Sequence, residues 1–501
     1  MALVALSACA HVPVEATTTP VEERNLFVEA NEDIIEYHIK DVRPDQLALD
    51  GLAILTTIDP AVSVERDTSQ VMLRQGKTVR RFKSPDPSDI AAWGTLTADV
   101  LRAARTLSNE VAALPDDRLD EMVIDASLAQ LDPFSRYARP EVAREHRAAR
   151  DGFAGIGVTL DIRESDVRIA SVLPDTPAAT AGLQAGDRIV ALDGVSIAGL
   201  TPDDIRRHLR GAERTLVQIA IARNGVDEPL RMTLERATIV PETVTLKEGA
   251  GIAWLKLRAF NQQTAQSLAA LLRQAHRDMG PQLHGIVLDL RDNPGGLLDQ
   301  SIDVASLFIS GGDVISTVGR NPQSQQHFTT IADVDPETLP MAVLIDGGSA
   351  SASEIVAAAL QDSGRAVVIG TSSYGKGTVQ NVLRTTNDGE LTVTWAQIIT
   401  RRGYKLNTHG VVPTLCTATI GDSPASLATL LAAGPGGVPP TLATARLSLD
   451  DAGWNALRKL CPPQRDKRAL DQAVATQLLT DPALYRRALA SMDAPRVAAK
   501  D

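Results

Sequence analysis

The sequence is poor in aromatic residues and cysteine, and it has no long apolar run. Only 3% of its 501 residues are Phe, Trp or Tyr, so any core must be mainly aliphatic. No run of 18 apolar residues occurs, so we expect no spanning helix. The eight histidines are scattered, and neither HExxH nor CxxC occurs, so a zinc hydrolase is unsupported and we expect no cofactor or metal. A net charge of −12 without a basic stripe argues against a nucleic-acid partner.

The three cysteines have two different contexts. Cys9 follows Leu6, Ser7 and Ala8 in a string similar to the lipobox of bacterial lipoproteins, and a Pro/Thr/Glu-rich stretch follows as a tether. The apolar start is short and lacks a basic segment, so a chance match is the alternative to lipidation of Cys9. Cys416 and Cys461 could form a disulfide in an oxidising compartment, or they could be two unrelated buried thiols.

A serine-rich turn precedes a predicted helix. Small residues from Gly347 to Ser353 lead into apolar residues at helical spacing from Ile355 to Leu360. Ser351 is therefore expected at or just before a helix start, where backbone N–H groups lack acceptors and could stabilise an oxyanion. The alternative is that the serines only cap the helix.

A lysine between two glycines follows a short predicted strand. Ala366–Ile369 is apolar and leads through Gly370 to Lys376. Because burial disfavours an ammonium group, Lys376 could lose its proton near neutral pH and act as general base toward Ser351. Gln380, four residues later, would orient the amine if this segment were a helical turn. A surface lysine in a glycine turn is the alternative.

A further glycine turn follows the strand predicted at Gly285–Leu290. The strand breaks into Arg291, Asp292, Asn293, Pro294, Gly295 and Gly296. Such a turn exposes backbone N–H groups. An ordinary strand-to-helix turn is the alternative.

These segments resemble the carboxy-terminal processing, or tail-specific, proteases, a family of Ser/Lys peptidases. The motifs GSASASE, QD, GKGTVQ and DLRxNPGG carry the resemblance. It implies that Ser351 is the nucleophile, Lys376 the general base and Gln380 the group that positions the lysine. It further implies an oxyanion hole made by N–H groups of Ala352 and of Gly295 or Gly296. Asp362, in the QD pair, also matches a family position, although packing or capping is its alternative role.

The segment Gly152–Arg236 resembles a PDZ domain. Its Gly155–Gly157 turn can present N–H groups to a terminal carboxylate, and the following strand can pair with an incoming peptide. A groove beside the helix predicted near Thr201–Leu209 would take apolar side chains of the ligand. The predicted substrate-binding residues are Gly155, Ile156, Gly157 and Val158. The alternative is that these glycines only shape a small barrel.

The remaining patterns complete a multidomain α/β fold. Amphipathic helices are expected at Asn31–Asp59, Ser88–Leu114 and Arg118–Leu131, before an LDPFSRY string in which Phe134 replaces a family histidine and predicts packing. Strands alternate with helices from Thr243 onward, which predicts a layered core. We expect these units: 1–24, a lipoprotein-like signal remnant and linker; 25–150, a helical N-terminal region; 151–240, a PDZ domain formed by a small β-barrel with helices; 241–421, a layered βα protease core; 422–501, a helical C-terminal region.

The expected function is that of a serine endopeptidase in the bacterial envelope, in the periplasm, that cleaves proteins or peptides with apolar C-terminal tails through an acyl-enzyme. Expected partners are these substrates, an activating adaptor, a second copy of the chain, and a membrane only through a lipid anchor. Two alternatives remain: a PDZ peptide-binding scaffold with a silent or partner-activated core, and a nucleotide-binding protein. The Gly370–Lys376 loop nearly spells a phosphate-binding loop, but Gly377 stands where that loop needs Ser or Thr.

Overall fold

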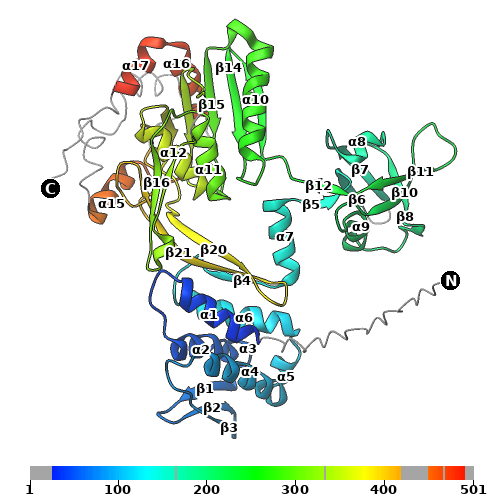
Figure 1. The fold of residues 1–501 in the computed structure, drawn as a ribbon, viewed down its shortest axis with the longest axis vertical. Helices are drawn as coiled ribbons and strands as arrows, with labels where there is room; N and C mark the ends of the chain where they lie inside the picture. The colour runs from blue at the N-terminus through cyan, green and yellow to red at the C-terminus, as the bar shows by residue number, and fades with distance from the viewer. Residues whose placement is uncertain (1–24, 164–165, 332–334, 419–449, 466–468, 491–501) are drawn as a thin grey trace, which may run out of the picture.

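The computed structural model describes residues 25–163, 166–331, 335–418, 450–465 and 469–490, so Cys9 lies outside the described residues. A helical N-terminal part and a small β domain lie on different sides of a layered α/β core (Figure 1). The predicted multidomain α/β class is confirmed, while the predicted unit boundaries stay predictions. Within the described residues, no helix is both long and apolar enough to cross a membrane.

The N-terminal part packs helices around an apolar core that includes Trp93. Its helices are α1 (Leu26–Tyr37), α2 (Pro44–Leu52), α3 (Ile54–Ile58), α4 (Ile90–Leu107), α5 (Asn109–Ala112), α6 (Asp116–Ala129) and α7 (Pro140–Asp151). The single helix predicted over Asn31–Asp59 is wrong, because Pro44 starts a new helix and the residue before a proline avoids the helical conformation. An unpredicted antiparallel sheet follows: β1 (Val62–Arg66), β2 (Gln70–Gln75) and β3 (Thr78–Lys83).

The small β domain has its own core, which includes Ile169 and Ile219. Its sheet has the order β11-β10-β8-β7-β6, so β6 is an edge strand. A two-stranded pair, β5 with β12, connects it to the rest of the chain (Figure 1). The elements are β5 (Phe153–Gly155), β6 (Val158–Arg163), β7 (Asp166–Val172), α8 (Pro177–Thr180), β8 (Arg188–Leu192), β9 (Val195–Ser196), α9 (Pro202–Leu209), β10 (Leu216–Ala222), β11 (Leu230–Glu235) and β12 (Ala237–Ile239).

The core is built on a six-stranded sheet of order β13-β14-β15-β18-β19-β22, in which only β13 is antiparallel to its neighbour. Its elements are β13 (Val244–Gly249), β14 (Ile252–Leu257), α10 (Thr264–Met279), the 3₁₀ turn η1 (Gly280–Gln282), β15 (Gly285–Asp289), α11 (Leu298–Ser306), β18 (Met341–Ile345), α12 (Ala352–Asp362), β19 (Val367–Gly370) and β22 (Leu415–Cys416). The central strands are buried on both faces, as parallel strands covered by helices require.

A second sheet of order β17-β16-β21-β20 joins this core to the N-terminal part, because β4 pairs with β21. Its elements are β4 (Arg136–Ala138), β16 (Asp313–Val318), η2 (Pro322–Ser324), β17 (Gln326–Thr329), β20 (Thr378–Arg384) and β21 (Glu390–Thr400). The C-terminal helices are α15 (Asp451–Leu460), α16 (Ala469–Thr480) and α17 (Pro482–Ala490). Residues of α16 and α17 share a buried cluster with the central strands, so these two helices cover the core sheet.

Candidate active site

Ser351 stands on a sharp turn between β18 and α12. It is the residue directly before the helix, as predicted, and its φ of 56° and ψ of −117° are unusual for a residue with a side chain. Such backbone strain costs roughly 1–3 kcal/mol and persists only where the surroundings enforce it. The Ala350 N–H donates to the Asn293 carbonyl at 2.9 Å, and the Ser351 N–H donates to Glu354 Oε2 at 2.8 Å. The turn is therefore fixed on both sides of the serine.

The Arg291–Gly296 turn packs directly against this serine. A Cβ added at Gly295 would lie 2.8 Å from the Ser351 Cβ, so only glycine allows the approach. The Gly295 N–H donates to Asn293 Oδ1 at 2.9 Å. For the N–H groups of Gly296 and Ala352, the described residues provide no acceptor. Of the two predicted glycines, Gly296 is the one whose N–H has no acceptor among the described residues.

Ion pairs stabilise the same turn. Arg291, which is 4% exposed, pairs with Asp289 at 2.8 Å and with Asp471 of α16 at 3.1 Å. The Lys256 ammonium contacts Asp289 at 3.1 Å. Burial lowers the pKa of the Lys256 amine, and Asp289 opposes that change. A C-terminal helix thereby supplies part of the support for the oxyanion turn.

Lys376 follows β19 and lies in a half-buried position near Ser351. Burial, and next the positive charge of Arg136, lower the pKa of the Lys376 amine, while Glu354 and Asp132 act in the opposite direction. The Phe134 ring lies over the amine, with Nζ 5.3 Å from the ring centroid, which agrees with the predicted packing role of this residue. Burial favours the neutral amine that a general base needs, whereas the face of the Phe134 ring stabilises the ammonium form.

Glu354, one helical turn after Ser351, connects the serine turn to the lysine loop. Its Oε1 accepts from the Ser373 hydroxyl and from the Gly375 N–H at 2.7 Å. Its Oε2 accepts from the Ser351 N–H and from the Lys376 N–H at 2.9 Å. Burial raises the pKa of this fully buried carboxyl, and the four donors oppose that rise. Because four donors fill the acceptor positions of both oxygens, the surroundings are complementary to the carboxylate.

Sequence reasoning assigned no role to Glu354. A signal exists, because Ser351 and Glu354 have the Ser-x-x-Glu spacing of a capping box. The other donors come from a loop about twenty residues later, and the local pattern does not reveal them.

The same four bonds bear on the nucleotide-binding alternative. In a phosphate-binding loop, the backbone N–H groups before and at the lysine must face the phosphates. Here the N–H groups of Gly375 and Lys376 both donate to Glu354. A carboxylate therefore occupies the position that a phosphate would need.

Gln380 lies on strand β20, so the predicted helical turn between Lys376 and Gln380 is wrong. Pairing of β20 with β21 fixes this segment as a strand. The Gln380 amide donates to Thr378 Oγ1 at 2.8 Å, and the described residues contain no hydrogen bond between Gln380 and Lys376.

Asp362 is the last residue of α12, at the opposite end from Ser351. Eleven helical residues span about 16 Å, which is too far for contact with the serine. Its carboxylate lies 3.8 Å from Arg402. This placement corrects its inclusion among the catalytic residues and agrees with the alternative structural role.

Ser351, Lys376 and Gln380 line one cavity of about 440 Å³. Gly295 and Gly296 lie at its edge, and Phe260, Leu298, Ile355, Val379 and Ile398 give it an apolar wall. His146 also lines the cavity, with Nδ1 3.9 Å from Glu390. Among the described residues, Ser351 Oγ has no hydrogen bond to Lys376 Nζ or to an imidazole. The cavity brings a hydroxyl, an amine and available N–H groups together, which suits acyl transfer to serine.

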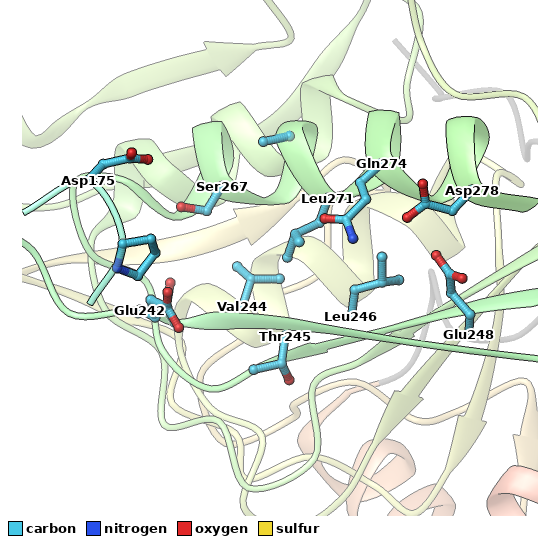
Figure 2. A pocket seen from close by; sticks show the side chains of 13 residues that line it. Asp175, Glu242, Val244, Thr245, Leu246, Glu248, Ser267, Leu271, Gln274 and Asp278 are labelled. Atoms are coloured by element: carbon cyan, nitrogen blue, oxygen red, sulfur yellow. The ribbon is translucent and has the colours of Figure 1, made fainter. Parts of the chain in front are cut away.

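A second cavity of about 430 Å³ lies between β6 and α9 of the small β domain. Gly155, Ile156, Gly157 and Val158 line it, as predicted for a peptide groove. A larger cavity of about 860 Å³ lies between β13, α10 and the Asp175 loop. Its labelled acidic residues are Asp175, Glu242, Glu248 and Asp278 (Figure 2), and no lysine or histidine is among its described lining residues. Its described lining contains the Ser267 hydroxyl but no amine or imidazole that could act as its base.

Comparison with known proteins identifies the family. Residues 251–416 match Peptidase family S41, and residues 168–223 match the PDZ domain. A carboxy-terminal-processing protease of Bartonella bacilliformis is 39% identical over 319 residues, which cover 63% of this chain and 73% of that protein. The chain belongs to the carboxy-terminal processing proteases.

A second relative agrees with this membership. The carboxyl-terminal-processing protease of Synechocystis is 33% identical over 58% of the chain and 69% of its own length. The solved photosystem II D1 C-terminal processing protease is 24% identical, with 77% of this chain and 91% of that chain covered and a TM-score of 0.38. Its family membership makes the protein a serine-type peptidase with a PDZ domain, as predicted, and peptides or proteins are its substrates.

Proposed function

We propose that this protease is a Ser351–Lys376 endopeptidase that acts on proteins with apolar C-terminal tails. The observation that carries the proposal is the cavity that Ser351 shares with a lysine whose pKa burial lowers. Both residues are tied through their backbone N–H groups to one carboxylate, that of Glu354. A relative movement of the two side chains is thereby restricted.

In the proposed reaction, neutral Lys376 removes the Ser351 proton as Oγ attacks the scissile carbonyl carbon. The N–H groups of Ala352 and Gly296 stabilise the oxyanion. As the C–N bond breaks, the lysine ammonium returns the proton to the amine product, and an ester of Ser351 remains. Water, deprotonated by the same lysine, then hydrolyses the ester and restores the serine. Gln380 lines the cavity and is proposed to contact substrate or the lysine in the working complex.

The tail specificity is assigned to the PDZ groove. The edge strand β6 offers unpaired backbone groups to an extended peptide, and the Gly155–Gly157 turn lies at one end of the groove. A terminal carboxylate at this turn and apolar side chains beside Leu209 would fill it. The tail would thus be held in one domain while the cut is made in another.

We also place the enzyme in the periplasm of a bacterial envelope, anchored through a lipid on Cys9. The Cys416–Cys461 disulfide supports an oxidising compartment. The lipobox-like string before Cys9 supports the anchor. An activating adaptor and a second copy of the chain are proposed partners.

The decisive experiment is cleavage of a peptide with an apolar C-terminal tail. Ser351→Ala and Lys376→Ala should each lower kcat/KM by at least roughly 10³-fold, because the nucleophile and its base act as one unit. Lys459→Met, which removes an exposed lysine, is the control. Cleavage retained in both active-site variants would refute the dyad. No cleavage by the wild type with any tail would support the scaffold alternative.

A further inference from the structure

The C-terminal helix α15 reaches the loop that carries Lys376. The guanidinium of Arg458 donates from one nitrogen to the His409 carbonyl at 2.6 Å. From the other nitrogen it donates to the carbonyls of Ser373 at 2.9 Å and Tyr374 at 3.4 Å. One side chain thus binds three carbonyl groups, two of them within three residues of the lysine. A planar guanidinium can make such a set of contacts, whereas an ammonium cannot match its fork.

The same guanidinium lies near the buried carboxylate of Glu354. A Cβ added at Gly410 would lie 2.6 Å from the guanidinium and 3.2 Å from Glu354 Oε1, so both groups converge on this point. Glu354 in turn holds the N–H groups of Ser351 and Lys376. Arg458 is therefore a cation next to the carboxylate on which both proposed catalytic residues depend.

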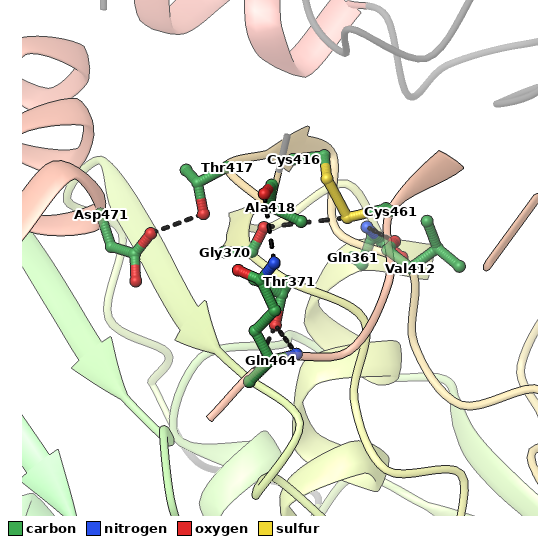
Figure 3. Close-up of a disulfide and its surroundings, with 10 residues drawn as sticks. All are labelled: Gln361, Gly370, Thr371, Val412, Cys416, Thr417, Ala418, Cys461, Gln464 and Asp471. Carbon is green, nitrogen blue, oxygen red and sulfur yellow. Dashed lines mark hydrogen bonds between the residues drawn. A yellow bond between two sulfur atoms is a disulfide. The ribbon is translucent and has the colours of Figure 1, made fainter. Parts of the chain in front are cut away.

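Three contacts fix α15 at this place. Trp454 is buried and stacks on His409 with ring centroids 5.0 Å apart. The Cys416–Cys461 disulfide joins the residue after α15 to the end of strand β22 (Figure 3). Just beyond it, the Gln464 N–H donates to Thr371 Oγ1 at 3.2 Å (Figure 3). The Gln464 carbonyl accepts from the Gly347 N–H at 2.6 Å. This segment therefore contacts the start of the serine turn as well as the lysine loop.

We propose that Arg458 is a positioning residue for the Ser351–Lys376 pair, and that the Cys416–Cys461 disulfide keeps it in register with the lysine loop. The inference rests on the proposed Ser/Lys function. Arg458 is not among the described residues that line the active-site cavity, so it acts through the loop and not on the substrate. Its loss should therefore lower kcat and leave KM unchanged.

The test compares full-length variants on one tailed peptide. Arg458→Met removes the charge and the three hydrogen bonds but keeps an apolar stem, and its kcat should fall roughly 10- to 100-fold, as expected for a small displacement of a catalytic group. Arg458→Lys should give an intermediate kcat. Lys459→Met removes the neighbouring exposed cation on the same helix and should match the wild type. KM should stay within about twofold throughout.

The disulfide is tested in the same assay. The double variant Cys416→Ser/Cys461→Ser should lower kcat by less than Arg458→Met does. When all three substitutions are combined, the fold-loss of kcat should be smaller than the product of the two separate fold-losses, because both changes act on the same loop. If circular dichroism shows that Arg458→Met does not fold, the proposal is tested with Arg458→Lys only. A lowered kcat at unchanged KM in that variant supports the proposal.

Two outcomes would overturn it. One is a kcat of Arg458→Met, or of Arg458→Lys where only that variant folds, equal to that of the wild type. The other is an equal loss in Lys459→Met. Ser351→Ala and Lys376→Ala distinguish failure of the Ser/Lys function from failure of the positioning role. Activity in these two variants refutes the Ser/Lys function. If they are inactive while Arg458→Met keeps the wild-type kcat, only the positioning role is refuted.

Discussion

The lysine loop of the core and the glycine turn of the PDZ domain both present backbone N–H groups that suit a carboxylate, but they differ in where that carboxylate comes from. In the core, the N–H groups of Gly375 and Lys376 donate to the buried carboxylate of Glu354. In the PDZ domain, the N–H groups of Ile156 and Gly157 have no acceptor among the described residues, and the turn opens onto a cavity. A carboxylate complements both loops. The protein supplies it in the first case, and we propose that the ligand supplies it in the second.

This difference explains why one loop can be a fixed catalytic element and the other a reversible binding element. An internal carboxylate in a buried place satisfies its donors permanently and resists movement. An open turn gains its partner only when a peptide binds. Changes to the first loop should therefore affect kcat, and changes to the second should affect KM.

Outside the Ser351–Lys376 pair, the largest effect is expected from Glu354→Gln. The amide cannot accept four hydrogen bonds, and its NH₂ group would face N–H donors in a buried place. We expect kcat for a short peptide without a tail to fall by at least roughly 100-fold, because Ser351 and Lys376 lose their common anchor. Glu213→Gln, at an exposed PDZ position, is the control. Wild-type kcat in Glu354→Gln would show that the core loop does not need its carboxylate.

Gly157→Ala should give the opposite kinetic signature. At φ 84° a side chain is strained, and the new Cβ would lie 2.3 Å from the Thr176 Cβ, so the turn must shift. A cost of about 1–2 kcal/mol in tail binding raises KM for a tailed peptide roughly 10-fold. The kcat for a short peptide without a tail should not change.

Gly225→Ala is the matched control, since Gly225 has a φ of 83° with no atom within 4 Å of the added Cβ. An equal rise of KM in this control, or a fall in kcat for the short peptide with Gly157→Ala, would contradict the division of work between the two loops.

A smaller effect is expected on the pH profile. A base must be unprotonated, so kcat/KM should rise with pH through the lowered pKa of Lys376. Arg136→Met removes the positive charge that, after burial, lowers the pKa of the Lys376 amine. The pKa of Lys376 should therefore rise, and the midpoint of the kcat/KM profile should move to higher pH. An unchanged or lower midpoint would show that the Arg136 charge does not help to keep the amine neutral.

The smallest effect is expected from Asp187→Asn inside the PDZ domain. Asp187 pairs with Arg223 through two contacts of 2.7 Å, and this pair lowers the pKa of the Asp187 carboxyl. The stability it contributes is present above the ordinary Asp pKa and is lost as the pH falls through the lowered value. Hydrogen exchange of PDZ amides should show a loss of about 1 kcal/mol at neutral pH, which shrinks in acid.

Cleavage of the short peptide should be unchanged in Asp187→Asn, because neither Asp187 nor Arg223 is among the described residues that line the active-site cavity. A parallel loss of short-peptide cleavage would mean that PDZ stability and core chemistry are coupled.

Sequence reasoning was most reliable where one local pattern decides the structure. The strands predicted at Gly285–Leu290 and Ala366–Ile369 correspond to β15 (Gly285–Asp289) and β19 (Val367–Gly370), because each is a short run rich in Ile and Val next to a glycine. Ser351 was expected at a helix start and is found there, since the small residues before α12 cannot continue the strand.

The failures have a common cause in contacts between distant segments. Gln380 would have oriented the lysine only from a helical turn, but pairing with β21 makes its segment a strand. The sheet β1-β2-β3 was missed because Arg and Gln interrupt its apolar alternation. Arg458 carried no signal at all, since its three carbonyl partners lie about 50 to 85 residues earlier in the chain.

The central claim is that Lys376 is a neutral amine at the working pH of the enzyme. The most direct measurement is an NMR titration of the lysine side chains in ¹³C-labelled full-length protein, with Lys376→Ala used to assign the resonance. We predict that the Lys376 signal titrates well below the ordinary range of lysine and that its midpoint coincides with that of kcat/KM. A Lys376 signal that titrates in the ordinary range while kcat/KM rises at a lower pH would contradict the account.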